Sequence, residues 1–298
     1  MSQYLPGSKL VFASLGYAAD GPYLQVNDVD EKIQLQLPVL GRTFTIRFLE
    51  QRYCVGSFDL STYESAACEL GVDLPPVGIC KDDMCPKCRE LTGFNPMFYN
   101  VDSISPQQRA YNQTPHFVYM AYFSPEHFKV GISSETRGIE RLLEQGALVA
   151  AVLKRFPNAD EARALEAHLC AQEGILETMR LQTKVKLLSE HFDPNSAIDL
   201  VRQKAESYGV SPEGKILDLT PFYFGKVSKR PLLQQVPAGE PVDIAAGRCV
   251  GMVGGTLCME QNGSVFCVPV KEFESHQVEI FIDEIQHEYD FVEAMSLF

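Results

Sequence analysis

The amino-acid sequence predicts an α+β fold in which β-rich regions at both ends enclose a cysteine-rich segment and a small module of strands and helices. Apolar and polar residues alternate at both ends of the chain, five of the nine cysteines fall in one short stretch, and apolar runs alternate with helix-like patterns in the middle third. The predicted regions are a β-rich region (1–53), the cysteine-rich, zinc-binding segment (54–114), the central module with appended helices (115–210) and a β-rich region with an acidic tail (211–298).

The composition is that of a globular protein without a membrane span. Hydrophobic residues make up 45% of the 298 positions and charged residues 22%, with no low-complexity tract and no internal repeat. The chain has no run of about eighteen apolar residues, which a membrane-spanning helix would need. Residues 1–20 carry a single Lys and a broken apolar stretch, so they make a poor signal peptide. We therefore expect a cytoplasmic protein.

The formal net charge of −13 counts against a protein that binds nucleic acid avidly and without regard to sequence, because phosphate backbones are also negative. The charge is uneven along the chain. Residues 272–293 are strongly acidic, whereas residues 184–230 carry a group of basic side chains: Lys184, Lys186, Arg202, Lys204, Lys215, Lys226, Lys229 and Arg230. A local nucleic-acid site is therefore compatible with the composition.

The N-terminal β region is predicted over residues 9–53. Apolar residues alternate with polar ones at positions 33–37 and 44–48, and this period of two is typical of half-buried strands. Between the two patterns, Pro38 and Gly41 predict a turn.

The C-terminal β region is predicted from Lys215 onward. Asn262-Gly263 lies between two apolar runs and predicts a hairpin with a tight primed turn. The glycines of residues 247–254 are interpreted as β-turns and bulges, because no strand–glycine–helix pattern surrounds them. The final residues predict either a helix or a loose acidic tail. Since both ends of the chain are β-rich and neither is long, we expect one sheet that the middle of the chain interrupts.

The middle of the chain predicts a β-hairpin, a helix, a third strand and a second helix. The predicted bounds are 116–123 and 128–133 for the hairpin strands, 133–146 for the first helix and 147–156 for the third strand. The second helix begins after Asn158, because an Asn followed three residues later by Glu161 resembles a capping box. Residues 175–210 have a helical, amphipathic pattern.

The clustered cysteines predict a structural zinc site. Cys85-Pro86-Lys87-Cys88 has the C-x-x-C spacing that lets two thiolates bind one tetrahedral ion. Two further ligands lie upstream, and the absence of histidine from the cluster favours four thiolates. The predicted ligand set is Cys54, Cys68, Cys85 and Cys88, with Cys80 as the alternative ligand.

Two other interpretations of these cysteines remain open. Free cysteines are often small buried apolar residues, and a C-x-x-C pair can be a redox site. The segment has too few apolar residues to hold itself together, which favours a metal. The other four cysteines are predicted to be core residues: Cys170, Cys249, Cys258 and Cys267.

Residues 115–171 resemble the GIY-YIG endonuclease module in its K-[IV]-G variant. Val118-Tyr119 followed by Lys129-Val130-Gly131 resembles the two strand motifs that give these enzymes their name. The order of the functional residues also matches: Arg137 and Arg141 fall in the helix after the hairpin, and Glu166 in the helix after the third strand.

The resemblance implies a nuclease that uses one divalent ion, magnesium or manganese, to cut phosphodiester bonds in DNA. It implies that Glu166 holds the ion, since magnesium keeps most of its waters and needs few carboxylates. Tyr119 would orient or deprotonate the attacking water, and Arg141, or else Arg137, would stabilise the transition state. Lys129 would contact phosphate, and Gly131 would let the backbone approach the substrate.

Each of these residues also has a structural interpretation. Tyr119 fits a strand core, the two arginines could pair with Glu140 or Glu144 on a helix surface, and Glu166 could flank an apolar stripe. Val130 replaces the second tyrosine of better-known members. The alternative function is therefore a catalytically inactive, zinc-containing module that binds nucleic acid or a protein, and a third is a purely structural zinc adapter. The nuclease interpretation requires Tyr119, Arg141 and Glu166 to converge on one open cleft.

The chain as a whole also resembles an uncharacterised bacterial family with the same layout. The shared features are a β-rich front, an R-x-C-x-G segment at residues 52–56, a later C-x-x-C, the K-V-G-I-S and E-Q-G-A segments and a β-rich tail. This resemblance supports the architecture and implies no particular activity.

Overall fold

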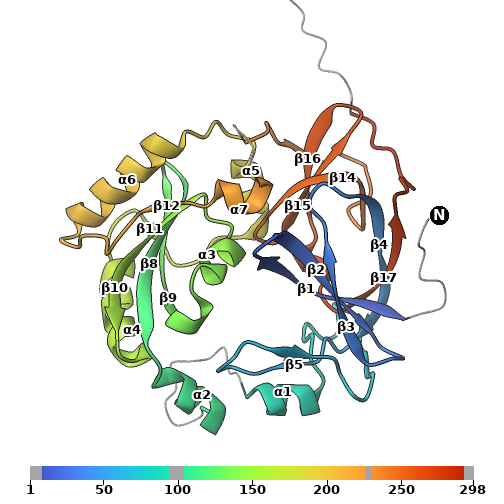
Figure 1. Ribbon diagram of the computed structural model, residues 1–298, viewed down its shortest axis with the longest axis horizontal. Coiled ribbons are helices and arrows are strands. Elements are labelled where there is room, and N and C mark those ends of the chain that lie inside the picture. The colour runs from blue at the N-terminus through green and yellow to red at the C-terminus, as the bar shows by residue number, and fades with distance from the viewer. Residues whose placement is uncertain (1–8, 94–103, 226–229, 292–298) are drawn as a thin grey trace, which may run out of the picture.

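The structure is a computed structural model, and it describes residues 9–93, 104–225 and 230–291 (Figure 1). It confirms the predicted α+β class. Figure 1 shows a large sheet on the right and a smaller sheet on the left, with the short helices α3 and α7 between them and the cysteine-rich segment below. Among the described residues, no helix is long and apolar enough to cross a membrane.

The large sheet has ten strands drawn from both ends of the chain, in the order β13-β16-β15-β14-β4-β17-β1-β2-β3, with β7 paired to β4. The strands are β1 (Leu10–Ala18), β2 (Gly21–Asp28), β3 (Ile33–Pro38), β4 (Thr43–Tyr53), β7 (Asp73–Leu74), β13 (Gln234–Gln235), β14 (Ile244–Val253), β15 (Thr256–Gln261), β16 (Ser264–Pro269) and β17 (His276–Ile282). Since β17 pairs with both β1 and β4, the N- and C-terminal strands form one sheet, the arrangement that the sequence favoured.

The local patterns explain the strands of the large sheet. Phe44, Ile46 and Phe48 of β4 are all buried, as their period of two predicted. Asn262 and Gly263 have φ angles of 51° and 80° and connect β15 to β16, which confirms the predicted primed turn.

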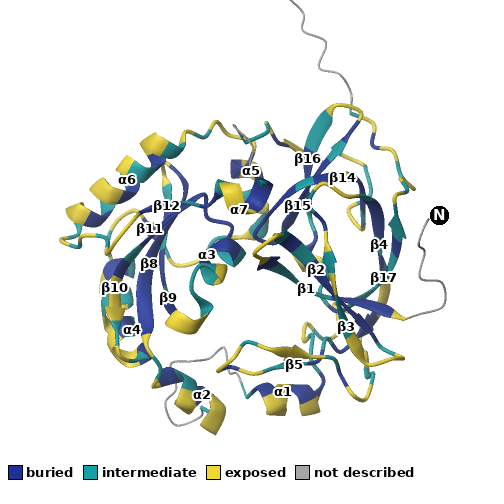
Figure 2. Cartoon of the chain, in the orientation of Figure 1, coloured by how far each residue is buried: buried dark blue, intermediate teal, exposed yellow. Residues whose placement is uncertain are grey.

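The smaller sheet has five strands in the order β11-β9-β8-β10-β12. Its strands are β8 (His116–Ser124), β9 (His127–Ser134), β10 (Val149–Phe156), β11 (Ile175–Leu176) and β12 (Leu217–Asp218). All nine residues of β8 are buried, so both faces of this central strand are covered, as its dark blue colour in Figure 2 shows. This explains why its sequence is one continuous apolar run.

Two helices, α4 and α6, pack on the smaller sheet, and each begins after a residue whose side chain caps its first turn. In α4 (Ala159–Cys170), the Asn158 side chain accepts a hydrogen bond from the Glu161 backbone N–H, which confirms the predicted N-cap. Helix α4 packs against β8, β9 and β10, and α6 (Pro194–Ser207) packs against β8 and β10.

Two predicted helical regions were wrong in detail. The helix predicted over 133–146 is a 3-10 turn (Glu135–Arg137) and a separate helix α3 (Glu140–Gln145), because Gly138 between them adopts a φ of 45°. Residues 175–210 form β11, α5 (Leu181–Leu187) and α6, because Asp193 and Pro194 start a new helix. The short helix α7 (Thr220–Phe224) was not predicted.

The remaining elements lie mostly in the cysteine-rich segment. They are β5 (Ser57–Phe58), β6 (Ser65–Ala66), α1 (Pro86–Thr92), α2 (Pro106–Asn112) and a 3-10 turn before β17 (Lys271–Phe273). Residues 283–291 form no helix beyond a short turn, and the end of the acidic tail lies outside the described residues, as do Lys226 and Lys229 of the basic stretch.

Candidate functional site

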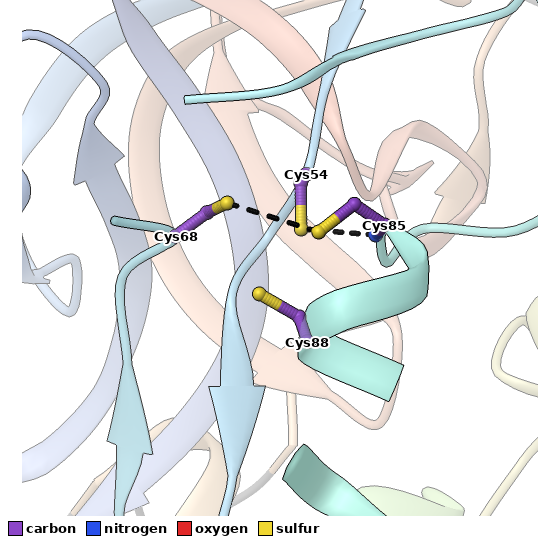
Figure 3. Close-up of side chains that lie close together, drawn as sticks. All are labelled: Cys54, Cys68, Cys85 and Cys88. Atoms are coloured by element: carbon purple, nitrogen blue, oxygen red, sulfur yellow. Dashed lines mark hydrogen bonds between the residues drawn. The ribbon is translucent and has the colours of Figure 1, made fainter. Parts of the chain in front are cut away.

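The four predicted zinc ligands lie together in the structure. Cys54 follows β4, Cys68 follows β6, and Cys85 and Cys88 are the N-cap and the first turn of α1. Their sulfur atoms all lie within 4.8 Å of one another and face a common centre, as Figure 3 shows. All four cysteines are buried, and this group could bind a metal such as zinc.

The surroundings of the sulfurs suit a bound cation. Cys54 Sγ accepts hydrogen bonds from the backbone N–H groups of Cys85 at 3.1 Å and Gly56 at 3.4 Å. Burial raises the pKa of Cys54 to about 11, whereas the pKa of Cys68 is lowered to about 7, because the N–H groups of Val72 and Leu70 outweigh its burial. Four buried thiolates would repel one another, so a divalent cation is the partner that lets all four lose their protons.

Cys80, the alternative ligand, lies outside the cluster. Its thiol donates to Asp82 Oδ2 at 3.4 Å and is partly exposed. The core prediction for the remaining cysteines is confirmed for Cys249, Cys258 and Cys267, while Cys170 is only partly buried.

Sequence analysis missed the role of Arg52, which anchors the cysteine-rich segment to the large sheet. Arg52 is 2% exposed and lies near the end of β4. Its guanidinium donates to the carbonyl oxygens of Pro75, Cys80 and Asp82 at 2.6, 2.7 and 2.7 Å, and to Ser275 Oγ at 2.9 Å. The signal available in the sequence was a basic residue two positions before a metal ligand, at the end of an apolar strand.

A second site is a cavity of about 1180 Å³ beside the smaller sheet, here called the arginine pocket. All six residues of the nuclease resemblance line it: Tyr119, Lys129, Gly131, Arg137, Arg141 and Glu166. The structure thus brings together residues of β8, β9, α4 and the segment 135–145 at one cavity.

Tyr119 and Gly131 are directly opposite each other on β8 and β9. A Cβ atom at Gly131 would lie 2.6 Å from Tyr119 Oη, far inside van der Waals contact. The tyrosine ring therefore occupies the space above the glycine, which differs from our expectation that this space admits the substrate. Glycine at position 131 is what lets the ring lie flat across the hairpin.

Burial changes the pKa values of three side chains in the arginine pocket: Tyr119, Glu166 and Lys129. Burial raises the pKa of Tyr119, and the nearby Arg141 opposes this shift only in part. Burial also raises the pKa of Glu166, against the opposing charges of Lys129 and Arg163. The pKa of Lys129 is lowered by its burial and by Arg141. The tyrosine is therefore protonated near neutral pH.

The two candidate arginines also make an ion pair outside the pocket. Both Arg137 and Arg141 bind Glu144, the latter at 3.5 Å, so one of the two helix-surface partners suggested by the sequence is correct. Both arginines nevertheless line the arginine pocket.

Two residues of the pocket were not predicted. His116 is 1% exposed, and its Nδ1 lies 2.7 Å from the Thr114 carbonyl oxygen, so Nδ1 carries the proton. Within the described part of the chain, its buried Nε2 has no hydrogen-bond partner. Arg163 contributes a further positive charge and pairs with Asp160 at 3.1 Å. Neither residue belongs to a short motif, so sequence reasoning had no signal for them.

The cysteine-rich segment supplies a third unpredicted residue, Tyr63, at the turn between β5 and β6. Its hydroxyl lies 3.1 Å from Ser134 Oγ, and its ring lies 4.9 Å from the guanidinium carbon of Arg137. Cys54 and Cys68 lie on either side of this hairpin. The cysteine cluster thus lies at both ends of a hairpin whose tip forms part of the arginine pocket.

The arginine pocket is locally cationic in an acidic protein. Four cations line it, Lys129, Arg137, Arg141 and Arg163, against three carboxylates, Asp160, Glu166 and Glu177. This contrasts with the net charge of −13 for the whole chain. An anion in this pocket would meet these four positive side chains, two of which, Arg137 and Arg141, also contact Glu144.

The model of one protein family, described as protein of unknown function (DUF2797), matches residues 41–278. The chain belongs to this family. No curated protein and no solved structure matches it.

The DUF2797 match contains the four clustered cysteines and the six residues of the nuclease resemblance. It begins just before β4 and ends within β17, so β1, β2 and β3 lie outside it. The DUF2797 unit thus joins part of the large sheet, the metal cluster and the arginine pocket in one stretch of chain.

Proposed function

We propose that this protein is a nuclease that hydrolyses phosphodiester bonds in DNA with the help of a divalent metal ion. The observation that carries the proposal is the convergence of Tyr119, Arg141 and Glu166 on one cavity with a local excess of positive charge. In hydrolysis, a bond forms between the water oxygen and phosphorus, the bond to the leaving oxygen breaks, and that oxygen gains a proton.

The residues of the arginine pocket have different roles in this hydrolysis. Arg141 and Arg137 offer planar donors to the phosphate oxygens, where negative charge accumulates in the transition state. Lys129 contacts the phosphate as a point charge. Tyr119 orients the water through its hydroxyl rather than removing its proton, because burial keeps the phenol protonated.

Glu166 is the residue that would hold a magnesium or manganese ion. It fits this role because it is partly buried and lines the cavity, and the charges of Lys129, Arg163 and Arg141 oppose the rise of its pKa that burial causes, which favours the ionised form that binds a metal. A bound ion would supply charge neutralisation at the phosphate. For the cysteine cluster we propose structural zinc, since four thiolates and no open position suit an ion without a catalytic role.

Cleavage of duplex, single-stranded and branched DNA and of RNA, with magnesium or manganese, tests the proposal. We expect the wild type to cut DNA and Glu166→Gln to lose this activity. Arg141→Ala should lower the rate about 100- to 1,000-fold, as does the loss of a transition-state donor in other enzymes. Glu173→Gln, an exposed change outside the pocket, serves as the matched control. Equal cleavage by the wild type and Glu166→Gln would contradict the proposal.

A second candidate function is a catalytically inactive module that binds nucleic acid or a protein. The pairing of both arginines with Glu144 favours it, because a neutralised guanidinium is less available to a phosphate. Fluorescence anisotropy with labelled DNA separates the two functions. Binding that Arg141→Ala weakens, without cleavage of any substrate by the wild type, would establish the binding module and exclude the nuclease.

A further inference from the structure

A second cavity of about 740 Å³ adjoins the arginine pocket and shares Phe58, Tyr63 and Arg137 with it. Its volume lies within the range of about 300–1,000 Å³ typical of small-molecule sites. Three glutamines of β2 and β3 line it, so we call it the glutamine pocket: Gln25, Gln34 and Gln36.

The two pockets have opposite charge. Four carboxylates line the glutamine pocket, Glu64, Glu140, Glu144 and Glu274, against two cations, Arg137 and Lys271. Both cations are already paired, Arg137 with Glu144 and Lys271 with Glu274 at 3.7 Å. The glutamine pocket would repel a phosphate, whereas the arginine pocket would attract one. A ligand that spans both pockets must therefore carry its anionic end in the arginine pocket.

The glutamine pocket offers hydrogen-bonding groups to the uncharged end of such a ligand. Gln34 Oε1 accepts a hydrogen bond from Ser65 Oγ at 3.0 Å, which fixes the orientation of the amide. Within the described residues, its buried Nε2 has no partner and is free to donate. The side chain of Glu140 lines the pocket, and no hydrogen bond or ion pair joins it to another described residue, so its carboxyl oxygens are open to accept a hydrogen bond.

Aromatic side chains complete the glutamine pocket. Tyr63 stands at the boundary of the two cavities, and Tyr23 lies at the wall formed by β2. Tyr23 lies over Gly16, where a Cβ atom would be 2.2 Å from the ring, so the ring is held against the sheet. Aromatic faces of this kind stack on nucleobases whatever their identity.

We propose that the glutamine pocket binds a nucleobase of the nucleotide next to the phosphate in the arginine pocket, and that it prefers bases with an amino group. Glu140 accepts from the amino group, Gln34 donates to a ring acceptor, and the tyrosines contact the base face. Adenine, cytosine and guanine offer an amino donor and a ring acceptor, whereas thymine lacks the amino group. Since a paired and stacked base cannot enter a pocket, the substrate is single-stranded or has an extruded nucleotide at this point. This inference rests on the proposed function.

Free nucleosides test the pocket without cleavage, because they carry no phosphate. Deoxyadenosine, deoxycytidine, deoxyguanosine and thymidine are titrated into the full-length, metal-loaded protein, and binding is followed by calorimetry or by NMR saturation transfer. We expect the three amino-bearing nucleosides to bind more tightly than thymidine. Gln34→Ala and Glu140→Ala should each weaken them about three- to tenfold, the effect of one lost hydrogen bond.

Matched controls keep this test specific. Gln203→Ala on α6 and Glu126→Ala at the β8–β9 turn are exposed changes at residues that line neither cavity, and they should leave nucleoside binding unchanged. Equal binding of thymidine and deoxyadenosine would overturn the amino-group assignment. Absence of binding, or binding that neither pocket variant weakens, would overturn the pocket itself.

The two proposals fail separately. Glu166→Gln should lose cleavage and still bind nucleosides, since Glu166 lines only the arginine pocket. Nucleoside binding in a protein that cuts no substrate would refute the nuclease and leave the base pocket standing. Cleavage without nucleoside binding would refute the base pocket and leave the nuclease standing.

Discussion

The two sheets and the cysteine-rich segment are held together in different ways. Both sheets and their helices share one continuous apolar core, which includes Phe12, Ile46, Leu153 and Leu257. Around the four clustered cysteines, only Val72, Leu74 and Met84 pack as partly buried apolar side chains in the described part of the chain. One region can therefore fold by burying apolar surface, whereas the other has little apolar surface to bury, and we expect it to depend on a metal bound by its sulfurs.

The largest expected effect comes from removing the metal. Structural zinc binds small cysteine sites with about 10–16 kcal/mol, more than the local apolar contacts can replace. Chelation, or Cys88→Ser, should abolish hydrogen-exchange protection at Cys54 and Val55, whose N–H groups bond to Val72 and Asp83, and leave β14 and β15 protected. Cys80→Ser, outside the cluster, is the control and should keep the metal. Unchanged protection after chelation would remove the contrast between the two regions.

A core truncation should produce the converse result. Leu257 is fully buried in β15, so Leu257→Ala should lower the free energy of unfolding by about 2–5 kcal/mol. The metal content of the folded protein should not change. Leu232→Ala, at a side chain that is 73% exposed, should cost less than about 0.5 kcal/mol. Chemical denaturation and metal analysis measure the two quantities; loss of metal in Leu257→Ala would show that the regions are not independent.

Gly131→Ala should have a smaller effect within the apolar region. The new methyl group would meet the Tyr119 ring, and the repacking should cost about 1–3 kcal/mol. Gly78→Ala is the matched control, because a Cβ atom there meets nothing within 4 Å and its φ is not positive. Denaturation midpoints compare the variants. Equal midpoints would show that the tyrosine ring moves freely.

The smallest expected effect concerns pH and Glu274. Burial raises the pKa of Glu274 to about 7, against the opposing charge of Lys271. The folded state therefore holds a proton that the unfolded state releases near pH 4.5, so the free energy of unfolding falls as pH rises from about 4 to 7 and is level above that. Glu274→Gln should remove this slope and gain about 1–2 kcal/mol at pH 8 relative to pH 4, because the side chain is partly exposed. Parallel pH profiles of wild type and variant would contradict this.

The parts of the fold that were predicted correctly depend on local signals. The alternation around Ile46, the Asn262-Gly263 turn and the Asn158 cap each act within a few residues, so the sequence shows them directly. The break at Gly138 was missed because a glycine can also lie within a helix. Its positive φ, which ends the 3-10 turn, is visible only in the folded structure. Helix α7 was missed because its aromatic run, with Pro221, has no helical period.

The candidate site was predictable only where its residues follow a known order. Tyr119, Arg141 and Glu166 were found through the resemblance to the GIY-YIG module, and the four cysteines by their clustering. Tyr63, His116 and the three glutamines come to their cavities through tertiary contacts between distant segments. No local pattern distinguishes them from ordinary surface or core residues.

The position of β17 has a consequence for how the chain is made. This strand lies between β1 and β4, although more than 200 residues separate it from either of them. On the ribosome, the edges of β1 and β4 that face each other must wait, unpaired, until residues 276–282 emerge. The large sheet therefore closes late and through contacts of high sequence separation, which makes its folding slow. A chain that stops before residue 276 would keep two incomplete half-sheets with exposed edges, and such edges are prone to aggregation.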